Sequence, residues 1–264
     1  MILNKVSIIV VSLNTKDDFI ETIKSINNQT YKNFEIIVID GKSNDGTEDE
    51  INQMRDSFSK IIIEKDNGIY DAMNKGIALV KGEWTVFLNS GDTFFEKVTL
   101  ERIFDNNKFS YIDVIFGNTI INNKKYKYKY KSMGKKFEKS TVIMPFCHQS
   151  SFIKSSLFKK NLFNLDFKLS SDFNFFYKCY LQKKNFCRLN IPFATIKSGG
   201  ISDNKRQQVY SENISIMKTY NKKKNILKIY MLKLLQGFKD ILKLIFPEKL
   251  KHLILRIKYN KKII

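Results

Sequence analysis

Short apolar runs that end in polar residues recur through the first part of the chain. These runs predict β-strands, because each is short, rich in branched side chains and bounded by turn-forming residues. The predicted strands span Val6–Ser12, Phe34–Ile39, Ile61–Glu64 and Trp84–Leu88. The first of them is apolar almost throughout, which is typical of a parallel sheet that is covered on both faces.

Segments with the 3.6-residue period of an amphipathic helix separate these strands. A predicted N-cap at Thr15 opens the first helix, the second begins at about Thr47, and the third spans Ile69–Val80. Strands that alternate with helices are the signature of a parallel sheet with right-handed crossovers. We therefore expect an α/β fold with a mostly parallel, Rossmann-like central sheet flanked by helices.

The regular alternation of strands and helices ends at Asp92. Beyond it we expect strands at Ile112–Phe116 and Ser150–Ile153, a helix at Ser170–Lys183, and a loop at Ser198–Ser202.

From about Lys218 the composition shifts to Lys, Leu and Ile, which predicts a basic helical tail at 218–264 behind a domain at 1–217. Pro247 should end the first tail helix, and Leu250–Ile257 repeats the mixture. A helical projection gathers lysines and two apolar residues in one sector, namely Lys224, Lys228, Lys239, Lys243, Ile229 and Leu232. Such helices can lie in the headgroup region of a membrane, or pack as a pair on the main domain or on a second subunit.

Charge is spread unevenly over the 264 residues, whose formal net charge is +20. Residues 1–100 carry 11 basic and 16 acidic side chains, whereas residues 218–264 carry 14 basic and 2 acidic ones. A basic surface attracts the phosphates of nucleic acids or anionic lipids, although a general lysine bias with solvated side chains is the plain alternative.

The three cysteines, Cys147, Cys179 and Cys187, have no CxxC spacing. This argues against a disulfide framework or a zinc site and favours a reducing compartment. The apolar run at Val6–Leu13 is too short for a signal peptide, and no uninterrupted apolar run approaches a membrane span. We expect a cytoplasmic protein that is peripheral on the inner face of the cell membrane.

Two of the predicted strands deliver acids to the same edge of the sheet. Asp40 follows the strand at Phe34–Ile39, and Asn89-Ser90-Gly91-Asp92 follows the strand at Trp84–Leu88. In open α/β sheets, ligands bind outside the carboxyl ends of the strands. Acids there suit a nucleobase or ribose at one position, and a cation with a diphosphate at the other.

Short motifs follow one another between residue 5 and about residue 205. They are Ser7–Asn14, Gln29-Thr30, Glu35–Thr47, Asp66–Gly76, Phe87–Asp92, His148–Phe152 and Ser171-Asp172. In this order and spacing the set resembles the family 2 glycosyltransferases. The resemblance implies a GT-A fold, a nucleotide-sugar donor, and inversion at the anomeric carbon of the sugar.

The resemblance also implies roles for residues near the donor. Ser12 and Asn14 match the loop that holds the nucleobase and ribose, and Asp40 and Asp66 match acids that contact the base. A carboxylate can accept the imide N–H of uracil, and losing that contact would leave a buried charge unpaired. A turn-forming role is the alternative for Asp40.

Asn74 and Lys75 match the polar or basic pair that lies near the diphosphate, while a solvated helix position is the alternative for Lys75. The metal motif departs from the family's Asp-x-Asp, because only Asp92 keeps a carboxylate. One carboxylate with diphosphate oxygens can hold a divalent cation, Mg²⁺ or Mn²⁺. His148 is a further candidate ligand, with a structural role as its alternative.

Asp172 matches the family's catalytic base, at the start of the predicted helix Ser170–Lys183. Direct displacement at the anomeric carbon needs a base within hydrogen-bond reach of the acceptor hydroxyl. The N-terminus of the helix would keep this carboxylate ionised, and a plain N-cap is the alternative.

Lysine and tyrosine alternate strictly over Lys125–Lys131, after an Asn122-Asn123 pair that could turn a hairpin. A period of two predicts a strand with tyrosines inward and lysines outward. The alternative is a basic aromatic face for an acceptor or a polyanion.

The sequence thus predicts an inverting transferase that moves a sugar from a nucleotide donor, expected to be UDP-linked, to a glycan acceptor of bacterial surface polysaccharide synthesis. We expect a lipid-linked acceptor at an anionic membrane surface, no nucleic-acid partner, and an oligomer as a possibility. One rival transfers sugar to polyprenyl phosphate, and another is a basic lipid- or nucleic-acid-binding protein with a vestigial site. A sugar nucleotidyltransferase is disfavoured, because residues 11–18 lack both Gly and Arg.

Overall fold

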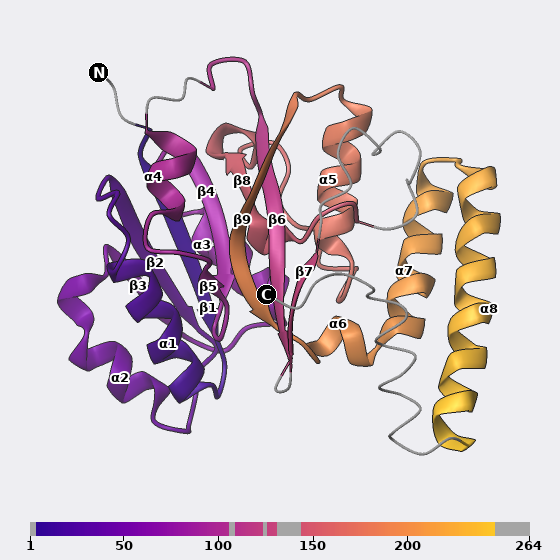
Figure 1. Cartoon of the computed structure of the whole chain (residues 1–264), viewed down its shortest axis with the longest axis horizontal. Coiled ribbons are helices and arrows are strands. Elements are labelled where there is room, and N and C mark those ends of the chain that lie inside the picture. The colour runs from indigo at the N-terminus through magenta and orange to yellow at the C-terminus, as the bar shows by residue number, and fades with distance from the viewer. Residues whose placement is uncertain (1–3, 106–108, 124–125, 131–143, 246–264) are drawn as a thin grey trace.

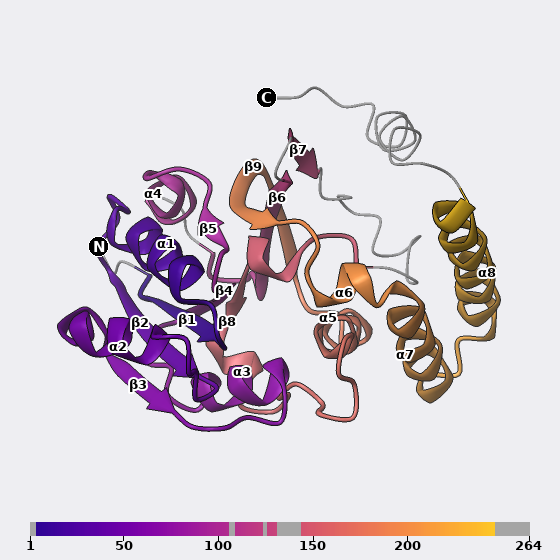
Figure 2. The same ribbon diagram turned by 90° about the horizontal axis from the view of Figure 1, so that it is seen from below.

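The computed structural model describes residues 4–105, 109–123, 126–130 and 144–245. A mixed sheet runs through the centre of these residues, with helices on both of its faces (Figures 1 and 2). Its strands are β1 (Val6–Ser12), β2 (Phe34–Asp40), β3 (Lys60–Ile63), β4 (Trp84–Asn89), β5 (Thr93–Phe94), β6 (Val114–Asn123), β7 (Tyr126–Tyr130), β8 (Ser151–Lys154) and β9 (Phe186–Lys197).

The helices alternate with the early strands and then gather after β8. They are α1 (Lys16–Asn27), α2 (Thr47–Gln53), α3 (Ile69–Ile77), α4 (Thr99–Phe104), α5 (Ser171–Leu181), α6 (Ile201–Asn204), α7 (Arg206–Thr219) and α8 (Lys223–Ile245). Short 3-10 turns are η1 (Arg55–Ser57), η2 (His148–Ser150) and η3 (Ser155–Leu157). The expected α/β fold with helices flanking the sheet is confirmed.

The first half of the sheet is parallel, in the order β3-β2-β1-β4. Ser12 lies beside Asp40, and Val11 lies between Ile39 and Asn89 in the registers of β1 with β2 and β4. The carboxyl ends of these strands therefore meet at one edge, as the sequence predicts.

The second half of the sheet is mixed. β8 runs antiparallel to both β4 and β6, β9 runs parallel to β6, and the short β5 runs antiparallel to β9. β6 begins at Val114 and continues to Asn123, well beyond the predicted Ile112–Phe116. The sequence does not predict β9, whose pairing with β6 shifts register near Asn118 opposite Pro192. A proline and a register shift obscure the strand signal.

Two further expectations meet the structure in this half. β7 lies within the predicted Lys125–Lys131 strand and pairs with β6 as a hairpin. The predicted loop at Ser198–Ser202 ends at Gly200, because α6 begins at Ile201.

The core forms one layer on each face of the sheet. Val6, Ile8 and Val10 pack with α1 and α4, whereas Ile9 and Val11 pack with the layer that holds α3 and α5. Alternate residues of β1 thus face opposite layers, as the period of a strand requires.

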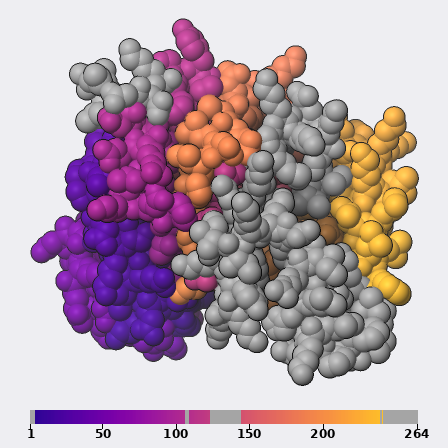
Figure 3. Space-filling model, in the orientation of Figure 1, coloured from indigo at the N-terminus to yellow at the C-terminus, as the bar shows by residue number. Residues whose placement is uncertain are grey.

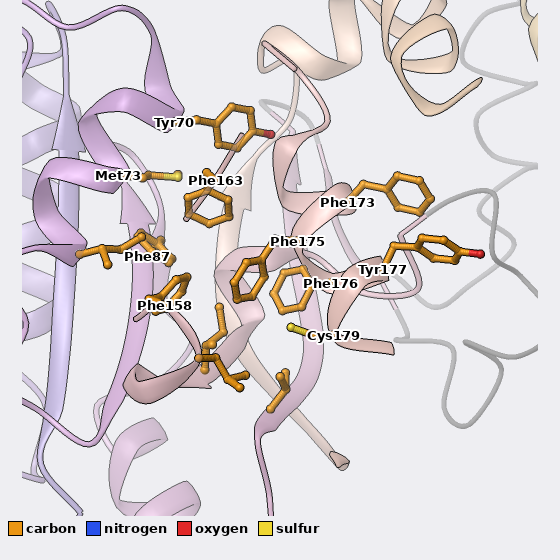
Figure 4. Packing of buried hydrophobic residues seen from close by; sticks show 14 of the residues in the cluster. Tyr70, Met73, Phe87, Phe158, Phe163, Phe173, Phe175, Phe176, Tyr177 and Cys179 are labelled. Carbon is orange, nitrogen blue, oxygen red and sulfur yellow. The ribbon is translucent and has the colours of Figure 1, made fainter. Parts of the chain in front are cut away.

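An aromatic cluster fills the layer between α3 and α5 (Figure 4). The rings of Tyr70, Phe87, Phe158, Phe163 and Phe175 pack with centroid distances from 4.9 to 5.9 Å across β4, α3 and α5. This packing fixes the relative positions of the three elements that carry the candidate site.

The tail helix α8 packs along α7, which in turn packs on α5 (Figure 2). Ile229 is fully buried in the core, and Ile226 and Leu232 pack against it. The predicted boundary after residue 217 falls in the last turn of α7. Of the two alternatives for the tail, packing on the main domain describes this side of α8. Pro247 and the segment Leu250–Ile257 lie outside the described residues.

Within the described part of the chain, no helix is both long and apolar enough to cross a bilayer.

Candidate active site

The loops after β1 and β2 are joined by the carboxylate of Asp40. Its Oδ2 accepts hydrogen bonds from the hydroxyls of Ser12 and Ser43, both at 2.7 Å, and its Oδ1 accepts the backbone N–H of Ser43 at 2.7 Å. Asp40 has no exposed surface. The sequence predicts that Asp40 contacts the base. In this structure donors of the chain itself surround Asp40 and shape the loop at the ligand edge, and its contact with a base stays a prediction.

Asn14 belongs to the same network. Its backbone N–H donates to Ser43 Oγ at 2.8 Å, and its side-chain oxygen accepts the N–H of Asn44 at 2.9 Å. A polar hollow of about 400 Å³ lies beside Asn14. Its other lining residues include three aspartates and one lysine, so the excess of negative charge disfavours a diphosphate there.

Asp66 packs so closely against the backbone of Gly41 that no side chain would fit at residue 41. A Cβ at residue 41 would lie 2.6 Å from Asp66 Oδ2 and 3.1 Å from Leu13 Cδ1. The other oxygen of Asp66 accepts the N–H of Gly68 at 2.8 Å. Leu13 is 52% exposed at the end of β1. A carboxylate oxygen and an exposed apolar side chain therefore border a bare stretch of backbone.

Asn74 and Lys75 are engaged within the protein. The side-chain amide of Asn74 donates to the carbonyl of Phe163 at 2.9 Å and accepts its N–H at 3.0 Å. Lys75 Nζ forms ion pairs with Glu64 at 2.9 Å and with Asp71 at 3.5 Å. Here Asn74 fastens α3 to the loop before α5, and the charge of Lys75 is balanced locally. Their predicted role near a diphosphate stays a prediction.

The turn after β4 is clamped from α1. Thr22 Oγ1 donates to the carbonyl of Asp92 at 2.8 Å and accepts the N–H of Gly91 at 2.9 Å. Gly91 has φ +93°, in the left-handed region that glycine adopts without strain. The clamp holds Asp92 at the ligand edge beside η2, which packs on β4.

Asp92 is buried with little compensation. Gln149 Nε2 donates to its Oδ2 at 3.2 Å, and 6% of the residue is exposed. Burial raises the pKa of Asp92 to about 7, although the neighbouring charge of His148 and hydrogen bonds lower it in part. The carboxyl is thus poised near neutral pH, where an added positive charge would ionise it.

Asp172 lies in the first turn of α5, at the centre of a second network. Its Oδ1 accepts the hydroxyl of Tyr70 at 2.9 Å and the N–H of Phe173 at 2.8 Å, and its Oδ2 lies 3.1 Å from His148 Nδ1. Burial alone would raise the pKa of Asp172, but His148 and Tyr70 hold it below its usual value. Burial and the nearby carboxylate raise the pKa of Tyr70 well above its usual value, so Tyr70 stays a proton donor.

Several buried polar atoms around η2 lack a hydrogen-bond partner. They include Asn89 Oδ1, Ser90 Oγ and His148 Nε2. Buried polar groups are normally satisfied, so such atoms mark a place where a ligand, ion or water binds. Among the described residues, no group of three or more His, Cys, Asp or Glu side chains is arranged to hold a metal. The oxygens of Asn89, Ser90 and Asp92 suit a hard cation whose remaining ligands come from a substrate.

Glu212 of α7 holds the backbone just before Asp172. Its carboxylate accepts the N–H groups of Lys168, Leu169 and Ser170 at 3.1, 2.9 and 2.9 Å. These groups precede α5 and have no partners within that helix. Glu212 therefore fixes where α5 starts, and with it the position of Asp172.

Sequence reasoning missed four residues of this site, namely Thr22, Tyr70, Gln149 and Glu212. Tyr70 and Gln149 lie inside motifs that the sequence singles out, next to residues that it assigns. Thr22 and Glu212 lie in helices at ordinary positions, and only the packing of those helices gives them a role.

Solved structures share this fold. TarS of S. aureus, residues 1–349 in complex with UDP, matches with a TM-score of 0.63 at 18% identity, covering 86% of this chain and 70% of that one. A mannosyltransferase of Pyrobaculum calidifontis in complex with GDP-Man and Mn²⁺ matches with a TM-score of 0.64 at 14% identity, covering 88% and 70%. In a longer TarS structure the match covers 39% of that chain. The fold is thus the GT-A fold of glycosyltransferases.

The family model for glycosyl transferase family 2 matches residues 7–183, and the chain belongs to this family. A PGL/p-HBAD biosynthesis glycosyltransferase of Mycobacterium bovis is 29% identical over 181 residues, 66% of this chain and 69% of that protein. A UDP-Glc:alpha-D-GlcNAc-diphosphoundecaprenol beta-1,3-glucosyltransferase of Escherichia coli is 43% identical over 90 residues, 33% of this chain and 35% of that protein. The protein is a glycosyltransferase, as the sequence predicts.

Proposed function

We propose that the protein transfers a sugar from a UDP-sugar to a hydroxyl of a glycan acceptor, with inversion at the anomeric carbon. The observation that carries this proposal is the state of Asp172. It is a buried carboxylate with a lowered pKa, held by Tyr70 and His148 beside the ligand edge of the sheet. A base that is ionised at neutral pH and fixed in place is what direct displacement requires.

The uracil would bind beside Leu13 and Asp66, next to the bare backbone of Gly41. Leu13 offers an apolar surface to the face of the base, and Asp66 Oδ2 can accept its imide N–H. This gives Asp66 the base contact that the sequence divides between Asp40 and Asp66, because Asp40 is surrounded by donors of its own chain. Two findings support UDP as the nucleotide: the solved complex of TarS with UDP, and the relative whose name includes UDP-Glc.

Asp92, with the side-chain oxygens of Asn89 and Ser90, would hold Mg²⁺ or Mn²⁺ against the diphosphate. His148 is a further candidate ligand through Nε2, which has no hydrogen-bond partner while Nδ1 lies against Asp172. When bound, the cation supplies positive charge that stabilises the departing UDP. The Mn²⁺ in the mannosyltransferase complex supports this assignment.

In the reaction, Asp172 accepts the proton of the acceptor hydroxyl as its oxygen forms a bond to the anomeric carbon. The bond from that carbon to the β-phosphate oxygen breaks on the opposite face, and UDP leaves with the electron pair. Tyr70 and His148 orient the carboxylate throughout. General-base catalysis of this kind is worth about 10²–10⁴ in rate.

The acceptor would be a lipid-linked oligosaccharide of surface polysaccharide synthesis, reached from the cytoplasm. A diphosphoundecaprenol-linked substrate in a relative's name supports this choice.

The test is a panel of UDP- and GDP-sugars, incubated with the full chain, with and without Mn²⁺, and with a synthetic diphospholipid-linked sugar. We expect the enzyme to turn over a UDP-sugar and none of the GDP-sugars. NMR of the product should show the opposite anomeric configuration to that of the donor. Retention of configuration would exclude the mechanism. Turnover of GDP-sugars only would exclude uracil as the nucleobase of the donor.

A further inference from the structure

Helix α8 carries a continuous apolar stripe that faces solvent. Its members are spaced three and four residues apart, so they share one side of the helix. They are Leu227, Tyr230, Met231, Leu234, Leu235 and Phe238, each between 45% and 75% exposed. In the space-filling view, α8 forms one edge of the molecule (Figure 3). We call these six residues the α8 stripe.

The α8 stripe is not needed to fold the helix onto the protein. The opposite side of α8 does that work, because Ile229 is fully buried and Ile226 and Leu232 pack against the core. Six large apolar side chains side by side form a patch of the kind that marks an interaction surface in soluble proteins. The sequence projection did not find it, because it grouped residues by their lysines rather than by which side the fold covers.

Exposed lysines accompany the α8 stripe. Lys223, Lys224 and Lys228 are exposed in the first turns of the helix. The segment 218–264 as a whole carries 14 basic residues and 2 acidic ones. Apolar side chains edged by lysines match a surface that is apolar inside and negatively charged outside.

We propose that the α8 stripe is a membrane-binding surface that inserts among the lipids of an anionic bilayer. The apolar side chains would lie at the boundary of headgroups and acyl chains, with lysines against the lipid phosphates. A second copy of this chain fits less well, because pairing two stripes would bring their basic edges together. The proposal does not depend on which sugar the enzyme transfers.

This surface is coupled to the candidate base through packed helices. α8 packs on α7, and Glu212 of α7 holds the backbone that precedes Asp172. On the proposed function, docking of α8 would therefore set the position of Asp172 relative to the bilayer in which a lipid-linked acceptor sits.

The test is flotation of the full chain with phosphatidylcholine vesicles, with and without phosphatidylglycerol. The variant Leu234→Glu/Phe238→Glu places two charges in the stripe without touching the core. Tyr111→Glu is the matched control, because Tyr111 is 87% exposed and lies outside α8. Thermal unfolding and UDP binding check that all three proteins are folded, and light scattering reports their oligomeric state.

We expect the wild type and the control to float with anionic vesicles, and the double variant to lose vesicle affinity by about tenfold or more. Added salt should weaken binding without abolishing it, since part of it is apolar. Equal flotation of the variant and the wild type would overturn the proposal, as would absence of wild-type binding. A wild-type dimer that the double variant converts to a monomer would also overturn it, by assigning the stripe to a second copy.

Discussion

The loop after β2 and the region around η2 both hold buried carboxylates, yet they differ in how their polar atoms are satisfied. Asp40 accepts three short hydrogen bonds from Ser12 and Ser43. Asp92 accepts a longer one from Gln149, and burial raises its pKa to about 7. Asp40 ends β2 and Asp92 lies in the turn after β4, and both strands flank β1, so position alone does not distinguish the two acids. The difference indicates that Asp40 has a structural role in shaping the site, whereas Asp92 is left to bind a positive charge.

The largest expected effect comes from Asp172→Asn. Removing the base should lower the transfer rate by about 10²–10⁴ while UDP affinity changes little, because the proposed base acts on the acceptor hydroxyl rather than on the nucleotide. Asp166→Asn, an exposed acid in the loop before α5, is the control. Steady-state kinetics with calorimetry of UDP binding decides the matter. A variant within a few-fold of wild type would leave Asp172 only a structural role in the first turn of α5, whose N-cap is Ser170.

Next in size is Asp40→Ala, which probes the satisfied region. It leaves the donors of Ser12 and Ser43 without an acceptor, so we expect a loss of about 3 kcal/mol in the free energy of unfolding. Urea denaturation measures this loss. Unchanged stability together with lost UDP binding would mean that Asp40 contacts the base directly.

In the absence of metal, Asp92→Asn should raise the free energy of unfolding, whereas Asp40→Ala lowers it. The pKa of Asp92 is raised on folding, so its ionisation disfavours the folded state progressively as pH rises from about 4 to 7. At pH 8 the amide should therefore stabilise the protein by about 2 kcal/mol, and the gain should shrink towards pH 4. Mn²⁺ should stabilise the wild type alone. Destabilisation by the amide at pH 8 would contradict the buried, uncompensated state of this acid.

A smaller effect is expected for Asp66→Ala. Losing one hydrogen bond to the base should weaken UDP binding by about tenfold and leave unfolding nearly unchanged. Asp71→Ala, an acid on α3 that pairs with Lys75, is the control. Calorimetry with UDP and with CDP, whose cytosine lacks the imide N–H, would show whether the loss of affinity is specific to uracil. An equal loss for both nucleotides would move the base contact elsewhere.

The smallest effect belongs to Glu212→Gln, which retains a side chain of the same shape but weakens its acceptor for the three N–H groups before α5. We expect kcat to fall about three- to tenfold with KM for the donor unchanged. Glu212→Ala should lower kcat further. A change in donor KM instead of kcat would show that Glu212 does not act by positioning Asp172.

Local signals in the sequence account for the parallel half of the sheet and for its ligand edge. β1 and β2 are apolar runs that end at Ser12 and Asp40, and both limits are set by nearby residues alone. The motif containing Asp172 also follows from local pattern, since it precedes a helix of recognisable period. Such features are predictable because the residues that determine them are neighbours in the chain.

The remaining features depend on distant contacts. β9 pairs with β6 across a register shift opposite Pro192, so neither strand alone shows the pairing. Asn74 looks like a ligand on α3, but its amide meets the backbone of Phe163, which comes 89 residues later. Glu212 likewise gains a role only when α7 packs near α5. No period or motif encodes such meetings.

The burial of Ile229 has a consequence for how the chain is made. The cluster that it joins begins with Ile9 and Ile37, so this layer of the core is contributed by opposite ends of the described chain. During synthesis the early strands emerge long before α8 does, and domains tend to fold from the N-terminus as they emerge. Until residue 229 leaves the ribosome, the surface of α7 that receives it stays uncovered. A premature stop codon between α7 and α8 would therefore yield an aggregation-prone product that is degraded, rather than a shorter active enzyme.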